Sequence, residues 1–453
     1  MTVVRFHKKD RIMTIDELYD IYLSCGGQVT TDSRTLQGGE LFFALKGENF
    51  DGNLYALKAL ENGAARAVVD EASGVTGEHV IPVPNTLEAL KALARHHREH
   101  FRVGGERLTV IGLTGTNGKT TTKELIRSVL SVKYVVSATE GNLNNDIGVP
   151  LSLLKIHEGT QLAVIEMGAN HPDDIRHLVE VAEPDFGLIT NVGKAHLLGF
   201  GSFEGVKKAK GQLYDHVAKH GRAVFLNADD PDLSAMAAKR GLSIVPYGVN
   251  TWGAMVLPSD AAHPFLRMAI PSEEDPDMLM GLETHLAGAY NAANVLAAIA
   301  VGRYFGVPLD EAIQAIESYE PNNSRSQMLR TARNTVIMDA YNANPTSMAA
   351  ALDNFAAMNE PHKIALLGDM RELGTDSVDE HVAVIRHLGP QPACLVGEEF
   401  RKALDLAGMP ESVRWFATSE DLARWLKENP LSGMMILVKG SRGIKMETVV
   451  PEL

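Results

Sequence analysis

The 453-residue chain is poor in cysteine, in long apolar runs and in basic residues. Its two cysteines, Cys25 and Cys394, lie far apart and in no metal-binding spacing, which argues against a disulfide framework or a zinc site. Two plain thiols are typical of a reducing compartment. The segment Met1–Asp10 has no apolar signal-peptide core, and no later stretch offers about 18 uninterrupted apolar residues. The sequence therefore predicts a cytoplasmic protein with no membrane partner.

The charge balance excludes a second class of partner. Lysine and arginine number 43 against 57 aspartates and glutamates, giving a formal net charge of −14. Binding to nucleic acid requires clustered basic surface, so we expect no nucleic-acid partner. Any polyanionic ligand must then be bound by local basic side chains and backbone groups. The composition, 45% apolar and 22% charged, is that of ordinary globular protein, and at roughly 150 residues per domain the length predicts about three domains.

The first hundred residues predict a small α/β domain. Glu40–Leu45 and Ala67–Val69 are typical of strands, and Leu54–Asn62 is typical of a short helix that Gly63 ends. The polar segment that ends in Gly104-Gly105 marks the first boundary, so this domain is expected over residues 1–104.

Strand-like and helix-like segments then alternate through residues 105–318. This alternation predicts a mostly parallel sheet covered by helices, with ligands at the carboxyl ends of the strands. Gly248–Met280 breaks the alternation and is consistent with an antiparallel addition. The expected strands are Val110–Leu113, Tyr134–Val136, Leu162–Ile165, Gly187–Thr190 and Ala223–Leu226; the expected helices are Lys119–Leu130, Asp173–Ala182, Phe203–Val217, Ala289–Phe305 and Pro308–Ser318, the last with proline in its first turn.

The turn-rich segment Tyr319–Ser324 marks the second boundary, and residues 319–453 are expected to form a third, open α/β domain. Its expected strands are Thr335–Met338, Lys363–Leu367, Ala393–Val396 and Met435–Val438, and its expected helices include Met348–Met358 and Leu422–Glu428.

A phosphate-binding loop connects the first strand of the central domain to its first helix. Gly115 and Gly118 allow the backbone to approach phosphate closely, and the helix start offers unpaired N–H groups to an anion. Lys119 is expected to reach the β and γ phosphates, and Thr120 to ligate Mg²⁺. The strict motif requires glycine where this chain has Leu113. The expected ATP-binding residues of the loop are Thr114, Gly115, Thr116, Asn117, Gly118, Lys119, Thr120 and Thr121.

Two polar residues follow neighbouring strands of the same domain. Glu166 ends an apolar strand and is expected on the sheet edge that carries the phosphate loop, where a second Mg²⁺ contact belongs. A carboxylate in this position is about as often a solvated strand end. His196 follows the next strand, and it is either a metal or phosphate contact or ordinary polar surface.

A lysine interrupts the apolar face of the helix that follows. Lys210 falls in a stripe that also contains Phe203, Val206, Leu213 and Val217. A lysine on a core-facing stripe is costly unless its ammonium is paired, reaches water or is chemically modified. Lys210 therefore either extends its ammonium to solvent or points towards the Mg²⁺ and phosphate site.

Four further residues have two equally supported interpretations. Asn291 and Asn294 fit either the interior of a helix or a ligand contact, and Asp339 follows an apolar strand at a position where open sheets bind ligands. Arg325 lies just beyond the second boundary, where it could bind phosphate across the domain interface.

Taken together, these segments resemble the Mur ligase family, ATP-dependent amide-bond synthetases of bacterial cell-wall precursor assembly. The phosphate loop is common to the whole superfamily. The segments Gly141–Pro150 and Asp339–Pro345 are more specific and are similar to the dipeptide-adding branch. The remaining matching segments are Thr31–Arg34, Gly39–Leu45, Glu166–Ala169, Leu367–Met370 and Val438–Arg442.

The resemblance implies an amino-terminal domain that holds UDP, a central ATPase domain and a Rossmann-like third domain. It implies ATP and Mg²⁺ as cofactors, and UDP-MurNAc-tripeptide and D-Ala-D-Ala as substrates of a monomer. The positions that match the family's catalytic residues are Lys119, Glu166, His196 and Lys210. Those that match its metal ligands are Thr120, Glu166, His196 and Lys210. In the family, the lysine at the position of Lys210 is commonly carbamylated. Asn291, Arg325 and Asp339 match nucleotide contacts, and Ser33, Arg34, Asn144 and Asn145 match substrate contacts.

Two other functions fit the same features. One keeps the ligase chemistry with another substrate, either a different Mur ligase step or polyglutamylation of a folate. The other is a nucleotide sensor that binds ATP without phosphoryl transfer, which the expected convergence of Glu166, His196 and Lys210 disfavours.

Overall fold

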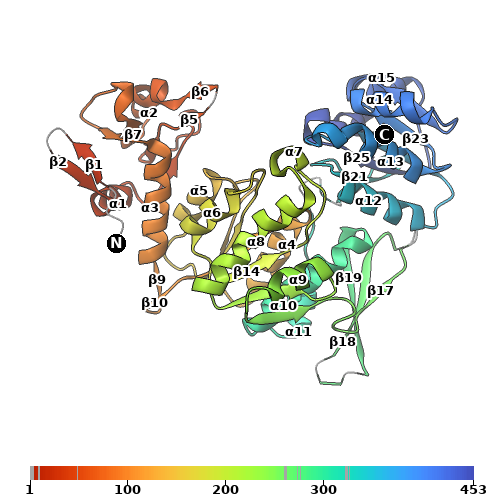
Figure 1. The fold of residues 1–453 in the computed structure, drawn as a ribbon, viewed down its shortest axis with the longest axis horizontal. Coiled ribbons are helices and arrows are strands. Elements are labelled where there is room, and N and C mark those ends of the chain that lie inside the picture. Colours follow the sequence, from red (N-terminus) through yellow and green to blue (C-terminus); the bar gives the residue numbers. More distant parts are fainter. Residues whose placement is uncertain are drawn as a thin grey trace.

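The computed structural model describes residues 5–8, 11–47, 49–259, 263–272, 274–275, 277–321, 325 and 327–453. Three α/β units follow one another along the long axis of the molecule (Figure 1), as the sequence predicts. The expected boundary segment Tyr319–Ser324 falls partly outside the described residues, which omit 322–324. None of the helices in the described part of the chain has the length and apolar composition needed to span a bilayer.

The first unit is built on a parallel sheet in the order β3-β4-β7-β8. Helix α1 begins after a capping box in which Thr14 and Glu17 satisfy each other's backbone N–H groups. Its elements are β1 (Arg5–Lys8), β2 (Arg11–Thr14), α1 (Ile15–Ser24), β3 (Val29–Thr30), β4 (Leu41–Phe43), β5 (Lys46–Gly47), β6 (Phe50–Asp51), α2 (Ala56–Glu61), β7 (Arg66–Asp70), β8 (Val80–Val83) and α3 (Thr86–His100).

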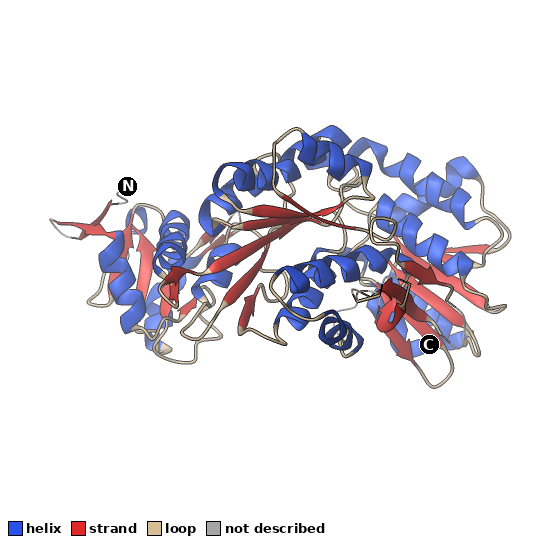
Figure 2. Cartoon of the chain, turned by 90° about the horizontal axis from the view of Figure 1, so that it is seen from below, coloured by secondary structure: helices blue, strands red, loops and turns tan. Residues whose placement is uncertain are grey.

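The second unit is a six-stranded, fully parallel sheet in the order β12-β13-β11-β14-β15-β16, with helices on both faces (Figure 2). Consecutive residues of β11 face opposite cores: Val110 packs with α8, and Ile111 packs with α4 and α10. Its elements are β9 (Arg102–Val103), β10 (Glu106–Arg107), β11 (Thr109–Thr114), α4 (Lys119–Leu130), β12 (Val136–Ala138), α5 (Gly148–Leu154), β13 (Leu162–Glu166), α6 (Asp174–Ala182), β14 (Phe186–Ile189), α7 (Leu197–Phe200), α8 (Phe203–His220), β15 (Ala223–Asn227), α9 (Pro231–Ala238), β16 (Ile244–Tyr247), α10 (Ala292–Tyr304) and α11 (Leu309–Glu317).

The antiparallel addition is present as a three-stranded sheet of β17 (Met255–Leu257), β18 (Phe265–Pro271) and β19 (Leu279–Ala287). Several expected boundaries were wrong; α8, for example, ends at His220 rather than at Val217. Strand pairing starts at Val136 rather than Tyr134, because the Tyr134 N–H still donates to the Leu130 carbonyl at 2.9 Å, in the turn that follows α4. Pro308 precedes α11 as its N-cap residue instead of lying in its first turn.

The third unit is an open sheet in the order β20-β21-β25-β22-β23-β24, parallel except for β20. The sequence interpretation named four of these strands and two of the helices, α12 and α15. The elements are β20 (Gln327–Arg330), β21 (Thr335–Asp339), α12 (Pro345–Ala357), β22 (Lys363–Gly368), α13 (Ser377–Leu388), β23 (Ala393–Val396), α14 (Glu398–Ala407), β24 (Val413–Phe416), α15 (Ser419–Glu428) and β25 (Met435–Lys439).

The first and second units share one hydrophobic core, whereas the third has its own. Tyr22 and Leu93 of the first unit belong to the same buried cluster as Leu153 and Leu178 of the second. Helix α3 adds buried polar contacts across this boundary: Arg98 pairs with Asp185 at 2.8 Å. The two clusters of the third unit are built almost entirely from its own residues. This difference leaves the third unit attached mainly through polar contacts.

Candidate active site

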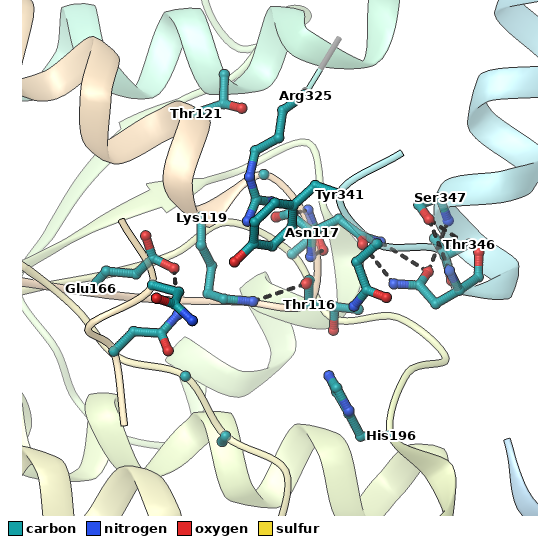
Figure 3. Close-up of a pocket in the computed structure, with 18 of the residues that line it drawn as sticks. Thr116, Asn117, Lys119, Thr121, Glu166, His196, Arg325, Tyr341, Thr346 and Ser347 are labelled. Carbon is teal, nitrogen blue, oxygen red and sulfur yellow. Dashed lines mark hydrogen bonds between the residues drawn. The ribbon is translucent and has the colours of Figure 1, made fainter. Parts of the chain in front are cut away.

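A cavity of about 500 Å³ lies between the second and third units. The loop after β11 and the ends of β13 and β14 contribute from the second unit; the ends of β21 and β25 and the start of α12 contribute from the third (Figure 3). Both sets are carboxyl ends of parallel strands, where open α/β sheets bind their ligands. The cavity is therefore the place where the two sheets present their loops to a common ligand.

The phosphate loop requires glycine at two positions. A β-carbon at Gly115, where φ is 151°, would lie 1.9 Å from Thr190 Oγ1, and one at Gly118, where φ is 79°, would lie 2.6 Å from Asn294 Oδ1. Leu113, which occupies the position of a glycine in the strict motif, is buried within β11. The tight turn accordingly begins two residues later, at Gly115.

Lys119 lies at the centre of the cavity wall, next to Glu166 and Thr116 (Figure 3). Its ammonium donates to the carbonyl oxygens of Gly115 at 2.8 Å and Thr116 at 3.0 Å rather than to a carboxylate. Burial lowers the pKa of Lys119 to about 8, and Arg325 adds to this shift while Glu166 opposes it. An ammonium held in this way gains stability when an anion enters the cavity.

Glu166 is buried at the end of β13, and only one of its two carboxylate oxygens accepts hydrogen bonds within the described chain. Its Oε1 accepts from Asn144 Nδ2 at 2.8 Å and from Thr120 Oγ1 at 3.3 Å. Its Oε2 has no hydrogen-bond partner within the described chain. A buried carboxylate oxygen without a donor is costly, so a cation fits here better than a neutral group.

Asn145, by contrast, uses its Oδ1 to cap α5 through the Gly148 N–H at 2.9 Å, although it also lines the cavity.

His196 lies where α7 begins and lines the cavity. Its backbone is left-handed, with φ at 51°, and its ring Nδ1 pairs with the Glu372 carboxylate of the third unit. Burial lowers the pKa of His196, and the nearby charges of Lys119 and Lys210 act in the same direction against Glu372. The ring is therefore held in its neutral form near neutral pH.

Lys210 lies on the buried stripe of α8, as predicted, and is 2% exposed. It does not line the cavity; its ammonium lies 5.8 Å from the centre of the Phe200 ring, beneath α7. Burial lowers the pKa of Lys210 well below its usual value, and Lys119 adds to the effect while Asp174 opposes it. The alternative in which this lysine simply extends to solvent does not fit a fully buried ammonium.

Asn291, which precedes α10, and Asn294, in its first turn, combine both of their expected roles. Asn291 donates to the Ala287 carbonyl at 2.8 Å and accepts from Asn294 at 2.9 Å; Asn294 in turn accepts from Thr122 Oγ1 at 3.0 Å. Both also line the cavity, beside Gly118. They thus support the phosphate loop and present polar atoms to the ligand space.

The third unit contributes a group of residues that the sequence interpretation named only in part. The Arg325 guanidinium lies 3.7 Å from the centre of the Tyr341 ring (Figure 3), and Asp339 pairs with the buried Lys439 at 2.6 Å. Lys439 neighbours Asp339 because their strands, β21 and β25, pair in register. Tyr341 and Lys439 were not named as site residues, but both lie in segments that resemble the family motifs, and this resemblance could have identified them.

An amide pair joins the phosphate loop to the third unit. Asn344 Nδ2 donates to Asn117 Oδ1 at 2.7 Å, while Asn344 also caps α12 in a capping box with Ser347. Asn117 is further fixed by its N–H, which donates to Asn191 Oδ1 at 3.0 Å. The sequence interpretation did not single out Asn191 or Asn344.

Ser33 and Arg34 are not part of this cavity. They lie after β3 in the first unit, where Arg34 pairs with Asp32 through two hydrogen bonds of 2.9 and 2.7 Å.

Three residues of the expected phosphate loop do not line the cavity themselves: Thr114, Gly115 and Thr120. They support the residues that do; Thr114 Oγ1, for example, donates to the Met167 carbonyl at 2.7 Å. Thr116 and Thr121 line the cavity.

Comparison with known proteins agrees with this arrangement. Three family models match: "Mur ligase family, catalytic domain" over residues 27–98, "Mur ligase middle domain" over 113–302, and "Mur ligase, glutamate ligase domain" over 324–442. The UDP-N-acetylmuramoyl-tripeptide–D-alanyl-D-alanine ligase of Bacillus subtilis is 34% identical, covering 94% of this chain and 92% of its own. The chain belongs to the Mur ligase family.

Further relatives extend the likeness to whole structures. The ligase of the same name from Escherichia coli is 34% identical over 94% of this chain and 93% of its own. A MurF crystal structure from Acinetobacter baumannii has a TM-score of 0.81 at 30% identity, covering 94% of this chain and 93% of that one. MurF from Thermotoga maritima in complex with ADP also has a TM-score of 0.81, at 26% identity over 94% and 96% of the two chains. The chain is accordingly an ATP-dependent ligase of this family with three α/β domains.

Proposed function

We propose that this chain joins D-Ala-D-Ala to UDP-MurNAc-tripeptide at the expense of ATP, as a cytoplasmic monomer in peptidoglycan precursor synthesis. The observation that carries the proposal is the Lys119 ammonium and the unpartnered Glu166 oxygen on one wall of a cavity that two domains close. The choice of substrates is supported by relatives of that name, which match 94% of the chain.

The proposed reaction has two steps. A terminal carboxylate oxygen of the tripeptide bonds to the γ-phosphorus of ATP while the bond from phosphorus to the β,γ-bridging oxygen breaks, which releases ADP. The amine nitrogen of D-Ala-D-Ala then attacks the acyl carbon of this acyl phosphate; the C–O bond to phosphate breaks, the amine loses a proton, and phosphate leaves. Lys119 stabilises the charge on the transferring phosphoryl oxygens, where electrostatic alignment supplies most of the catalysis.

Mg²⁺ fits the residues present. Glu166 Oε2 is a buried oxygen without a donor, and Thr120 Oγ1 lies 3.3 Å from the other oxygen of the same carboxylate. Oxygen ligands of this kind are those that Mg²⁺ prefers, although the described residues contain no cluster of three His, Cys, Asp or Glu side chains. The ion would neutralise charge on the phosphates, and His196 would face it or the phosphates from the opposite wall.

We infer that Lys210 carries a carbamate. The nitrogen lone pair of its neutral amine would attack the carbon of CO₂, forming an N–C bond while one C–O π bond opens onto oxygen. The nitrogen then loses a proton to solvent, and the product is an anionic carbamate that can act as a metal ligand. Burial favours the neutral amine that this reaction needs. In ¹³C-bicarbonate the protein is expected to show a carbamate carbonyl signal that Lys210→Ala lacks; a wild-type spectrum without it would refute this inference.

The division of labour among the domains is part of the proposal. Residues 1–104 would bind the UDP part with Ser33 and Arg34, residues 105–318 would bind ATP, with Asn291 and Asn294 beside the phosphate loop, and residues 319–453 would close over the nucleotide with Arg325 and Asp339. The separate core of the third unit supports a rigid-body closure that excludes water from the acyl phosphate. Small-angle scattering should then change on adding an ATP analogue with the UDP substrate, and unchanged profiles would argue against closure.

The decisive experiment is phosphate release by the purified protein. With Mg·ATP and UDP-MurNAc-tripeptide, release should require D-Ala-D-Ala, and mass spectrometry should detect UDP-MurNAc-pentapeptide. Release with a different amine in place of the dipeptide would assign the chain to another ligase step. No release by folded protein with any acceptor would favour a nucleotide sensor.

A further inference from the structure

The loop that connects β22 to α13 brings a carboxylate across the domain boundary to His196, which lines the cavity. Glu372 lies in this loop, and its Oε2 pairs with Nδ1 of His196 at the start of α7. Both residues have left-handed backbones, with φ at 65° for Glu372 and 51° for His196. Such a conformation is uncommon for residues other than glycine, so two of them in direct contact indicate that the surrounding structure fixes this pair.

Buried contacts hold the Glu372 loop in place. The Met370 N–H donates to Nε2 of the buried His381 at 3.0 Å, and the Arg371 N–H donates to Ser441 Oγ at 2.9 Å. These bonds fix the two residues that precede Glu372. The carboxylate is thus presented by a rigid loop of the third unit.

The contact determines which nitrogen of His196 faces the cavity. A carboxylate only accepts hydrogen bonds, so Nδ1 of a neutral His196 ring must carry the proton, and Nε2 is left with its lone pair. His196 lines the cavity and lies across from Arg325 (Figure 3). Without Glu372 the proton is free to occupy either nitrogen. A partner of this kind fixes both the tautomer and the ring orientation of a histidine that acts on a ligand.

We propose that Glu372 is a positioning residue that orients His196 across the domain boundary, so that the second unit acquires its working geometry only when the third unit docks. This proposal rests on the ligase function proposed above. It gives domain closure a chemical consequence: arrival of the third unit sets the proton on the ring of His196.

The matched control is Glu380, which forms the neighbouring ion pair across the same boundary. It accepts from Lys194 Nζ at 2.7 Å, and neither it nor Glu372 is among the residues that line the cavity. Glu372→Ala and Glu380→Ala therefore remove comparable interface carboxylates, and only the first removes the partner of His196. Glu372→Gln keeps an acceptor oxygen and is the conservative variant. Alanine and glutamine both have a β-carbon, as glutamate does, so neither substitution at position 372 relieves the strain of its left-handed backbone.

The first readout needs no substrate. In ¹⁵N-histidine-labelled protein, with His196 assigned through His196→Asn, long-range ¹H–¹⁵N spectra should show Nδ1 protonated in the wild type and in Glu380→Ala. Glu372→Ala should shift His196 to a mixture of tautomers or to the Nε2-protonated form. An unchanged His196 spectrum in Glu372→Ala would overturn the proposal, whatever the substrate proves to be.

The second readout is turnover. Glu372→Ala should lower kcat by about 10- to 100-fold, as loss of such a partner typically does, while KM for the UDP substrate stays within about twofold. Glu372→Gln should recover part of the loss, and Glu380→Ala should stay within about twofold of the wild type. Equal losses in the two alanine variants would mean that Glu372 only holds the interface, which contradicts the proposal. A wild type inactive with D-Ala-D-Ala would instead refute the proposed function and leave the spectral test standing.

Discussion

Replacing Lys119 by methionine should make the protein more stable and catalytically inactive. Methionine keeps most of the length and apolar contact of the lysine stem but removes the ammonium. Burial lowers the pKa of Lys119 to about 8 from an ordinary value of 10.5, so folding disfavours its charged form. The difference between these values corresponds to about 3 kcal/mol, and because the side chain keeps some contact with solvent we expect about 1–2 kcal/mol.

The sign of the pH dependence follows from the direction of this shift. Because the pKa is lower in the folded state, the unfolded chain binds more protons between pH 8 and 10.5. The penalty of burying Lys119 is therefore complete below pH 8, decreases as the pH rises from 8 to 10.5, and is absent above that range. The stability advantage of Lys119→Met should follow the same course.

Thermal unfolding and phosphate release together test this prediction. For a domain of this size the gain corresponds to a Tm about 2–8 °C higher at pH 7. The rate of phosphate release should fall by at least about 10³-fold, since a donor to the developing charge is lost. Lys208→Met, which removes an exposed lysine of α8, should leave both the Tm and the rate unchanged. A lower Tm for Lys119→Met at pH 7, an advantage that persists at pH 11, or a fully active variant would each refute the reasoning.

Two further predictions concern buried charges. Glu166→Gln preserves the shape of the side chain but removes the charge of the unpartnered oxygen. Turnover should therefore fall by about 100-fold or more and require a higher Mg²⁺ concentration, while the Tm does not fall. Full activity at the Mg²⁺ concentration that suffices for the wild type would contradict the metal assignment. Arg98→Met breaks the buried ion pair with Asp185, whose other carboxylate oxygen still accepts from Arg107 at 3.1 Å. Because Asp185 keeps this second partner, the free energy of unfolding, measured with denaturant, should fall by about 3 kcal/mol, the lower end of the range for such pairs. An unchanged unfolding midpoint would mean that this pair does not hold the first two units together.

Local sequence was sufficient for many of the elements and for the phosphate loop. Apolar periodicity predicted four of the six strands of the central sheet to within one residue at each end; it placed β12 two residues too early and did not identify β16. The bounds of α4 were predicted correctly because Gly118 and the following helix formers are local signals. Elements were missed in all three units, for example α3 in the first, α5 in the second, and α13 and α14 in the third, whose recognition depends on their packing partners.

The sequence by itself also determined that Lys119, Glu166 and His196 end neighbouring strands or begin the segments after them, because parallel strands place their carboxyl ends on one edge. Only the tertiary structure decided which residues meet there from the other domain. Glu372 and Asn344 lie 176 and 227 residues from their partners His196 and Asn117, and no local pattern encodes such pairings. The tertiary structure likewise decided that Lys210 is enclosed beneath α7 rather than solvated, and that Glu166 keeps one oxygen without a donor. Burial and partner choice depend on how whole domains pack, whereas strand order and loop chemistry follow from residues close together in the chain.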